Sequence, residues 1–94
     1  MAVGLWIQFS DTTEEQYEAM NSQMRVEEEP PEGLIFHSAG PNHLGWSIID
    51  FWESRELFDS FQAERLGAAI QALGDQAPDP PEIKEFPVHN IIKP

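Results

Sequence analysis

The chain has 94 residues, enough for one domain over residues 1–94 with a small core. Its 17 acidic and 5 basic residues give a formal net charge of −12, which argues against binding to nucleic acids or anionic membranes because both demand basic patches. The absence of cysteine excludes disulfides, thiolate metal sites and a cysteine nucleophile. We see no signal peptide and no apolar run long enough to span a membrane, and we therefore expect a cytoplasmic protein.

The first part of the chain predicts a strand, a helix, a loop and a second strand. Val3–Phe9 alternates as a strand. Thr12 and Glu15 have the spacing of a capping box, and the helix that follows carries a narrow apolar stripe of Tyr17, Met20 and Met24. Acidic residues and prolines at 26–32 predict a loop, and Leu34–Ala39 reads as the second strand.

A third strand, Trp46–Glu53, should form a hairpin with the second, because residues 40–42 have turn chemistry. Side chains alternate along a strand, which puts Trp46, Ile48, Asp50 and Trp52 on one face and Ser47, Ile49 and Phe51 on the other. Both faces are therefore largely apolar. The Asp50 carboxylate is expected to lie among aromatic side chains.

The remainder predicts a second helix and a last strand. Ser54 is a good N-cap for a helix over Arg55–Leu73, and Gly74 should end that helix. A proline-rich connector then leads to a strand over Ile83–Ile92, which Pro87 interrupts.

The element order βαββαβ predicts an α+β domain of the ferredoxin-like kind, in which two helices cover one face of an antiparallel sheet. The other sheet face would expose Ile49 and Phe51 unless another surface covers it. A homodimer is the economical solution, and we expect one.

The junction between the third strand and the second helix resembles that of a known family. It reads Trp52-Glu53-Ser54 and is followed by Phe58 and Phe61. This sequence is similar to the strand-to-helix junction of the antibiotic biosynthesis monooxygenase type of dimeric α+β barrel. The flanking segments 33–40 and 86–90 also look like small bacterial proteins of that superfamily.

The resemblance implies a barrel closed by the sheets of two subunits. It also implies one of several activities, because the superfamily includes monooxygenases, isomerases, haem-degrading enzymes and members without known activity. Haem degradation is disfavoured, since the haem-degrading members carry an Asn on the first strand and a His on the second helix. This chain has Gln8 on the first strand and no histidine on the helix.

Arg65 stands out on the second helix, because it falls inside an apolar arc that holds Phe58, Phe61, Ala68, Ala69, Ala72 and Leu73. A guanidinium on the core side needs a partner, and Asp50 is the natural candidate if its face of the third strand looks toward the helices. The pair could be a structural tie or a polar anchor in a ligand pocket, and Arg65 could also extend outward to water along its aliphatic stem.

His37 on the second strand could act as a base near neutral pH or could be a hydrogen-bonded structural histidine. We expect His89 to contact a partner subunit and His43 to be solvated in a turn. His37 and His89 should lie about 14 Å apart on opposite edges, too far to share a metal. No metal-binding spacing and no phosphate-binding loop occurs, so we predict neither a metal nor another cofactor.

Two functions remain open. The first is a cofactor-free enzyme, a monooxygenase, isomerase or cyclase, acting on a small aromatic or polyketide-like substrate. Its catalytic residues would be His37, Asp50 and Arg65. Its substrate would lie against a wall of aromatic side chains, namely Trp46, Trp52, Phe58, Phe61 and Tyr17. The alternative is a non-catalytic ligand-binding or structural dimer, in which the same side chains only fill the core.

Overall fold

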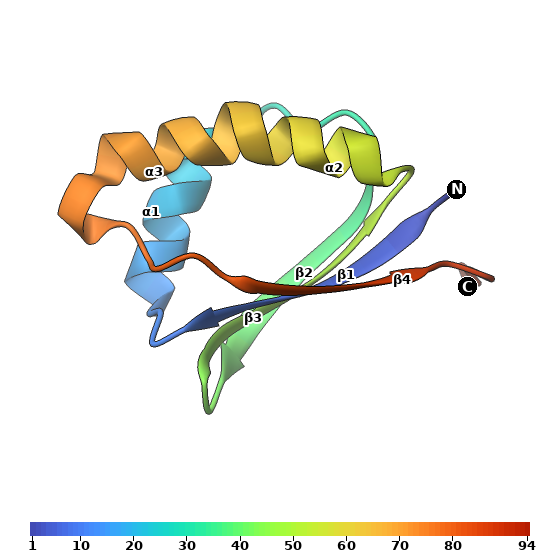
Figure 1. The fold of residues 1–94 in the computed structure, drawn as a ribbon, viewed down its shortest axis with the longest axis horizontal. Helices are drawn as coiled ribbons and strands as arrows, with labels where there is room; N and C mark the ends of the chain where they lie inside the picture. The colour runs from blue at the N-terminus through green and yellow to red at the C-terminus, as the bar shows by residue number, and fades with distance from the viewer.

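One antiparallel sheet with its helices packed on a single face makes up the structure (Figure 1). The computed structural model describes residues 1–94. Its elements are β1 (Val3–Ser10), α1 (Glu14–Met24), β2 (Leu34–Asn42), β3 (Gly45–Trp52), α2 (Arg55–Phe61), the π-helical turn η1 (Gln62–Leu66), α3 (Gly67–Leu73), the 3-10 turn η2 (Gly74–Gln76) and β4 (Glu82–Pro87). The predicted ferredoxin-like α+β class is confirmed.

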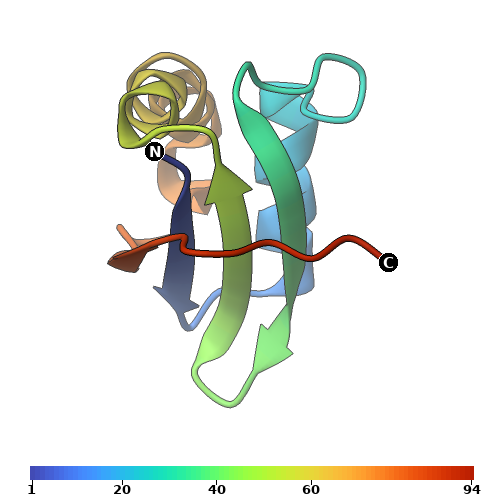
Figure 2. The ribbon, with the colours of Figure 1, turned by 90° about the vertical axis from the view of Figure 1, so that its right-hand side faces the viewer.

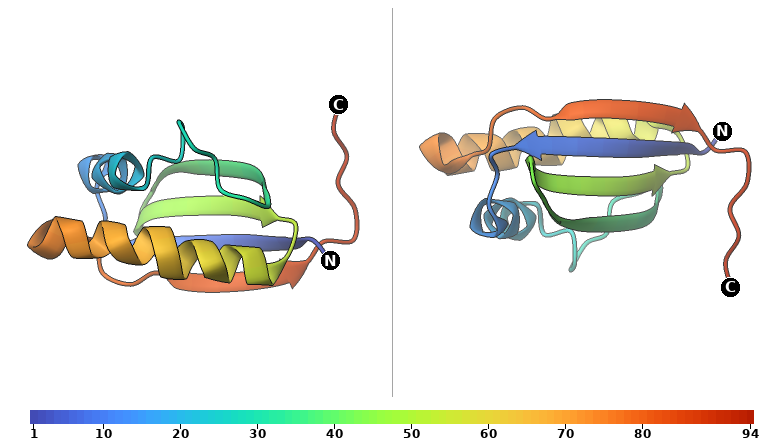
Figure 3. Two further views of the ribbon diagram at one scale, coloured as in Figure 1. Left: turned by 90° about the horizontal axis from the view of Figure 1, so that it is seen from above. Right: turned by 90° about the horizontal axis from the view of Figure 1, so that it is seen from below.

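The sheet has the strand order β2-β3-β1-β4, and its neighbouring strands are all antiparallel. Seen from above, α1 and the α2–α3 helix lie in front of the sheet, and seen from below no segment covers the strands (Figure 3). The buried core lies between these layers. Its members are Val3, Leu5, Ile7, Phe9, Tyr17, Met20, Trp46, Ile48, Trp52 and Phe58.

Helix α1 begins one residue later than the sequence suggested. Thr13, whose backbone is extended, accepts a hydrogen bond from Gln16 N through its hydroxyl (3.2 Å), and Gln16 Oε1 accepts one from Thr13 N (3.0 Å). The capping box expected from Thr12 and Glu15 is therefore wrong. Thr12 is buried, and its hydroxyl donates to the Ser10 carbonyl oxygen instead (3.2 Å).

The predicted hairpin of β2 and β3 is confirmed, but its turn is displaced. Residues 40–42 continue β2, and Asn42 pairs with Gly45 across the two residues between them. Asn42 Oδ1 accepts hydrogen bonds from the backbone N–H groups of Leu44 (3.2 Å) and Gly45 (3.0 Å), which holds the turn at this place. Pro41 is tolerated in β2 because an edge strand can lack one donor.

The second helix follows the prediction from Arg55 to Leu73, apart from one π-helical turn in its middle. Ser54 caps it by accepting a hydrogen bond from Leu57 N (3.2 Å), and Gly74, at φ +55°, ends it in a conformation that favours glycine. None of the helices combines the length and the apolar composition needed to cross a membrane.

The last strand is shorter than expected, because β4 ends at Pro87 rather than at Ile92. Val88 N donates a final hydrogen bond to the Ala2 carbonyl oxygen (2.9 Å). The chain beyond it runs away from β4 across the end of the sheet (Figure 2). Proline has no N–H to continue the ladder, which explains why the strand stops there.

The sheet face opposite the helices exposes several large apolar side chains. Three rings form a row across it: Phe36 and Phe51 have centroids 6.4 Å apart, and Phe51 and Phe86 have centroids 6.3 Å apart. Phe86 lies over Gly4, where a Cβ would overlap the ring unless the ring moved. Ile49 belongs to the same face and is 37% exposed. A monomer would therefore present a large apolar surface to water.

Candidate functional site

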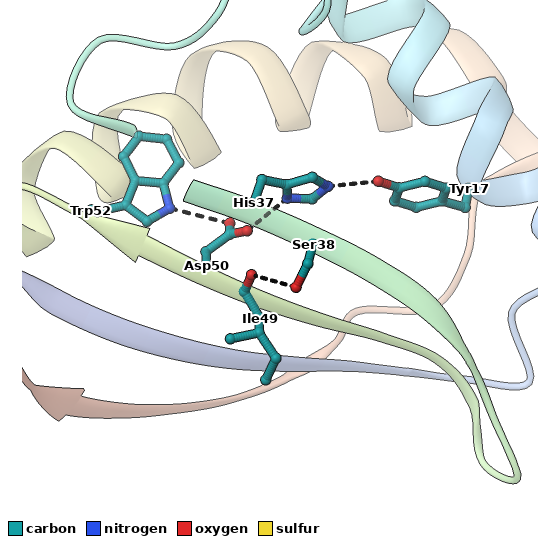
Figure 4. Close-up of polar contacts among 6 residues, drawn as sticks. All are labelled: Tyr17, His37, Ser38, Ile49, Asp50 and Trp52. Carbon is teal, nitrogen blue, oxygen red and sulfur yellow. Dashed lines mark hydrogen bonds and ion pairs between the residues drawn. The ribbon is translucent and has the colours of Figure 1, made fainter. Parts of the chain in front are cut away.

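Four side chains on the helix-facing side of the sheet form one hydrogen-bonded chain (Figure 4). Tyr17 Oη lies 2.6 Å from His37 Nε2, and His37 Nδ1 lies 2.6 Å from Asp50 Oδ1. The indole N–H of Trp52 donates to the other carboxylate oxygen, Asp50 Oδ2, at 3.1 Å. Asp50 is buried, whereas the side chain of His37 is 32% exposed.

Strand register brings three of these residues together. His37 on β2 is paired directly with Asp50 on β3, and both side chains point toward the helices. Trp52 lies two residues farther along β3 and so shares the face of Asp50. Tyr17 comes from α1, whose packing against the sheet places its ring parallel to the His37 imidazole, with an interplanar angle of 4°.

A bulge at Ile35 adjusts the end of β2. Leu34 pairs with Trp52, whereas Phe36 pairs with Phe51, so one residue of β2 lacks a partner between them. A bulge moves the following side chains to the opposite sheet face. Here it lets Phe36 face outward while Leu34 turns to the helix side and joins the wall of the cavity described below.

The donors define the direction of the hydrogen bonds. Because an indole N–H can only donate and a carboxylate can only accept, the proton between His37 and Asp50 belongs on Nδ1. Nε2 then accepts from the Tyr17 hydroxyl. Burial raises the pKa of Tyr17, the Asn21 amide opposes this effect, and the carboxylates of Glu18, Asp50 and Glu27 add to the increase. The phenol therefore stays protonated at neutral pH.

The chain of hydrogen bonds opens onto a cavity of about 470 Å³ between the sheet, α1 and the second helix. This volume is within the range of small-molecule sites. The loop after α1 contributes to the wall through residues 26, 27, 30 and 31. Most of the lining is apolar: Ile7, Phe9, Met20, Met24, Val26, Leu34, Ile48, Trp52, Phe58, Phe61, Leu66 and Ile83 contribute to it.

Most of the expected substrate wall does line this cavity, namely Tyr17, Trp52, Phe58 and Phe61. The expected catalytic residues His37 and Asp50 line it as well. Trp46 does not. It is buried behind Tyr17, with ring centroids 5.1 Å apart, and its indole N–H has no hydrogen-bond partner.

The expected ion pair between Asp50 and Arg65 does not form. One carboxylate oxygen of Asp50 is bonded to His37 and the other to Trp52. The Arg65 guanidinium instead donates to the Met24 carbonyl oxygen and lies over the Phe61 ring, 5.7 Å from its centroid. Arg65 is half-buried and does not line the cavity. Its bond to the Met24 carbonyl oxygen links α1 to the second helix.

Sequence reasoning missed several polar residues of the site. Asn21, Glu27 and Gln62 line the cavity, and Trp52 acts as a hydrogen-bond donor as well as an aromatic wall. Nothing in the local pattern pointed to Gln62, because its position depends on the π-helical turn that begins there.

The other histidines lie apart from this site. His43 is exposed in the hairpin turn, and His89 is exposed in the segment after β4. No group of three or more His, Asp or Glu side chains is arranged to hold a metal ion.

Comparisons with known proteins place this geometry on a familiar fold. No family model and no curated protein matches the chain, but solved structures do. A candidate antibiotic biosynthesis monooxygenase from Deinococcus radiodurans is 13% identical, with 99% of this chain and 97% of that chain covered and a TM-score of 0.63. SnoaB, a cofactor-independent oxygenase from Streptomyces nogalater, is 12% identical, with coverage of 97% and 95% and a TM-score of 0.63.

A dimeric ferredoxin-like protein of unknown function from Thermobifida fusca is also 12% identical, with coverage of 94% and 92% and a TM-score of 0.64. The TM-scores and coverages establish a shared fold, and the low identities establish nothing beyond it. The resemblance to antibiotic biosynthesis monooxygenases seen in the sequence is therefore confirmed for the fold, and the chemistry has to be argued from the site.

Proposed function

We propose that this protein is a cofactor-free enzyme that moves a proton on a small aromatic or polyketide-like substrate. The observation that carries the proposal is the chain Tyr17–His37–Asp50–Trp52, which ends at the wall of an apolar cavity. An oriented imidazole beside a buried carboxylate is the arrangement of a general base. The aromatic walls suit a planar ligand.

The base would act through Tyr17. A hydroxyl or acidic C–H of the substrate, placed at the phenol oxygen, gives up its proton as Tyr17 passes its own proton to His37 Nε2. The imidazolium that forms is stabilised by Asp50, which already accepts from Nδ1 at 2.6 Å. Trp52 holds the carboxylate in place from its other oxygen. Each group thus has one role in a single proton path.

The stabilised substrate anion then has two fates. In an isomerase or cyclase, the proton returns to a different atom or the anion attacks another carbon of the substrate. In a monooxygenase, the anion reacts with dioxygen, and a methylene becomes a carbonyl with release of one water molecule. The fold shared with SnoaB, itself a cofactor-independent oxygenase, supports the second possibility.

A second function, non-catalytic ligand binding, is favoured by one observation. The Tyr17 hydroxyl is hydrogen-bonded to Nε2 of His37 at 2.6 Å, so no free basic nitrogen of His37 faces the cavity. If the phenol never exchanges its proton with a ligand, the four residues only tie α1 to the sheet. The apolar cavity would then bind a ligand without changing it.

We also propose a homodimer that buries the open sheet face. This face carries Phe36, Ile49, Phe51 and Phe86, and a second copy would remove these side chains from water. The dimeric state of the Thermobifida fusca protein supports the proposal.

The catalytic proposal is tested with anthrone, whose methylene loses a proton to give a stabilised carbanion and whose oxidation product is anthraquinone. Oxygen consumption and product absorbance are followed with a chelator present. We expect turnover by the native protein, loss of at least about tenfold in His37→Ala, and no change in His43→Ala, which alters an exposed histidine outside the site. Anthraquinone should still bind His37→Ala.

Equal rates in native protein and His37→Ala would refute the catalytic role of His37. Tight binding of anthraquinone without oxidation or deuterium exchange at the anthrone methylene would establish the alternative, a non-catalytic binding protein.

A further inference from the structure

The charged groups in the cavity wall are of one sign. Asp50 and Glu27 line it, and no lysine or arginine does. Their fields act on the polar end of the cavity, because both carboxylates, together with Glu18 outside it, raise the pKa of Tyr17. A ligand that reaches the phenol therefore enters a region of negative potential.

None of the five basic residues of the chain lines the cavity. Arg65 is bound to the Met24 carbonyl oxygen, and Arg55 pairs with Asp59 and Glu85. Lys84 lies over the Trp6 ring, 5.0 Å from its centroid, on the sheet face without helices. Arg25 follows α1 and is exposed, and Lys93 is exposed near the C-terminus.

The four residues of the hydrogen-bonded chain offer no free donor to an anionic ligand. The carboxylate oxygens of Asp50 already accept from Trp52 and His37, and the Tyr17 hydroxyl donates to His37. A ligand carboxylate could accept from the amides of Asn21 and Gln62, but it would lose its hydration and find no cation in the wall, which is costly. A ligand hydroxyl or ammonium group, in contrast, can donate to the Glu27 carboxylate or to the phenol oxygen.

We propose that this cavity selects its ligand by charge, accepting neutral and cationic aromatic compounds and rejecting aromatic carboxylates, and that Glu27 is the specificity residue. The inference rests on the proposed function because it concerns the same cavity. Glu27 is exposed at the cavity wall, so solvent and salt weaken its effect without removing it. The substrate class is thereby narrowed to uncharged or amine-bearing ring systems.

The test uses three probes that share one ring system: 2-naphthalenemethanol, 2-naphthylmethylamine and 2-naphthoate, which are neutral, cationic and anionic at pH 7. Dissociation constants are measured by calorimetry at low and moderate salt. We expect the naphthoate to bind the native protein about tenfold or more weakly than the alcohol, and the amine to bind at least as well as the alcohol. The differences should shrink as salt increases.

Two variants separate the effect of Glu27 on naphthoate binding from the effect of the net charge of the protein. Glu27→Gln should strengthen naphthoate binding by about threefold and leave the alcohol unchanged. The control, Glu29→Gln, makes the same change in net charge on the same loop at an exposed residue that does not line the cavity, and it should alter neither probe.

Binding of all three probes with equal affinity overturns the charge selection and leaves the proposed function intact. An equal effect of the two variants on naphthoate overturns the role of Glu27. Failure of every probe to bind would refute the ligand site itself, and with it both the proposed function and this inference.

Discussion

The phenol oxygen of Tyr17 lies 2.6 Å from Nε2 of His37 and thereby joins α1 to the edge strand of the sheet. Tyr17 is buried, and its hydroxyl remains protonated at neutral pH because burial raises its pKa. The contact is at once a link between two layers of the fold and the first step of the proposed proton path.

Replacing Tyr17 by Phe should break this link. We expect the free energy of unfolding at pH 7 to fall by about 1 kcal/mol, the usual net value of such a hydrogen bond, and turnover of anthrone to fall while anthraquinone still binds. Chemical denaturation and the oxygen assay measure the two effects. Unchanged turnover in Tyr17→Phe would show that His37 takes the proton directly.

The raised pKa of Tyr17 also predicts a dependence of stability on alkaline pH. The folded state holds the phenol proton more tightly than the unfolded state, so the stabilisation is complete below the ordinary value of about 10 and is lost as pH rises through the raised value. Because the chain has a single tyrosine, the increase in absorbance near 295 nm on ionisation of a phenol reports this group. A midpoint at or below the ordinary value would contradict the burial effect.

Removing Asp50 should cost more stability than removing Arg65. Asp50→Ala leaves the N–H groups of Trp52 and His37 without an acceptor in a shielded region, at a cost of about 3 kcal/mol. Arg65→Ala loses a hydrogen bond to the Met24 carbonyl and a contact with an aromatic ring, at about 1 kcal/mol. Thermal and urea denaturation compare the two. An equal or larger cost for Arg65→Ala would contradict this ranking.

The open sheet face should control assembly. We expect the native protein to sediment as a dimer and Phe51→Lys to be a monomer, because the lysine would place a charge in the middle of the aromatic row. Leu44→Lys is the matched control, since Leu44 is 46% exposed but lies in the hairpin turn. A native monomer at micromolar concentration, or a dimer unaffected by Phe51→Lys, would exclude this interface.

Gly4 and Phe86 should be coupled. A Cβ on residue 4 would overlap the Phe86 ring, so Gly4→Ala must displace a ring that is 48% exposed and can rotate toward solvent. We expect Gly4→Ala to lower stability by about 1 kcal/mol and to cost much less in a Phe86→Ala background. Denaturation of the four proteins of this double-mutant cycle gives the coupling. Additive effects would mean that the two residues do not meet.

Several local patterns predicted the elements well. The alternation in Trp46–Glu53, the cap at Ser54 and the stop at Gly74 all have their expected roles. Each depends on neighbours within a few residues, so the sequence carries the necessary information.

The errors occur where two local solutions compete. Thr12 and Thr13 both have a capping partner three residues on, and the prediction chose the first, whereas Thr12 is buried against Ser10. Turn residues at 40–42 likewise suggested a turn there, but the Asn42 side chain stabilises a turn at residues 43 and 44. Packing and side-chain hydrogen bonds decided between nearly equivalent local choices.

The sequence by itself determined that the Asp50 carboxylate would share one face of the third strand with aromatic side chains, because side-chain alternation requires nothing beyond that strand. Only the tertiary structure decided which residue would pair with it. His37 is 13 residues away from Asp50 and reaches it through the hairpin register, and Tyr17 completes the chain from a separate helix. Strand register and helix docking depend on the packing of the whole core. In the packing that results, His37 and Trp52 bond to Asp50, and Arg65, although on the apolar side of its helix, binds the Met24 carbonyl oxygen.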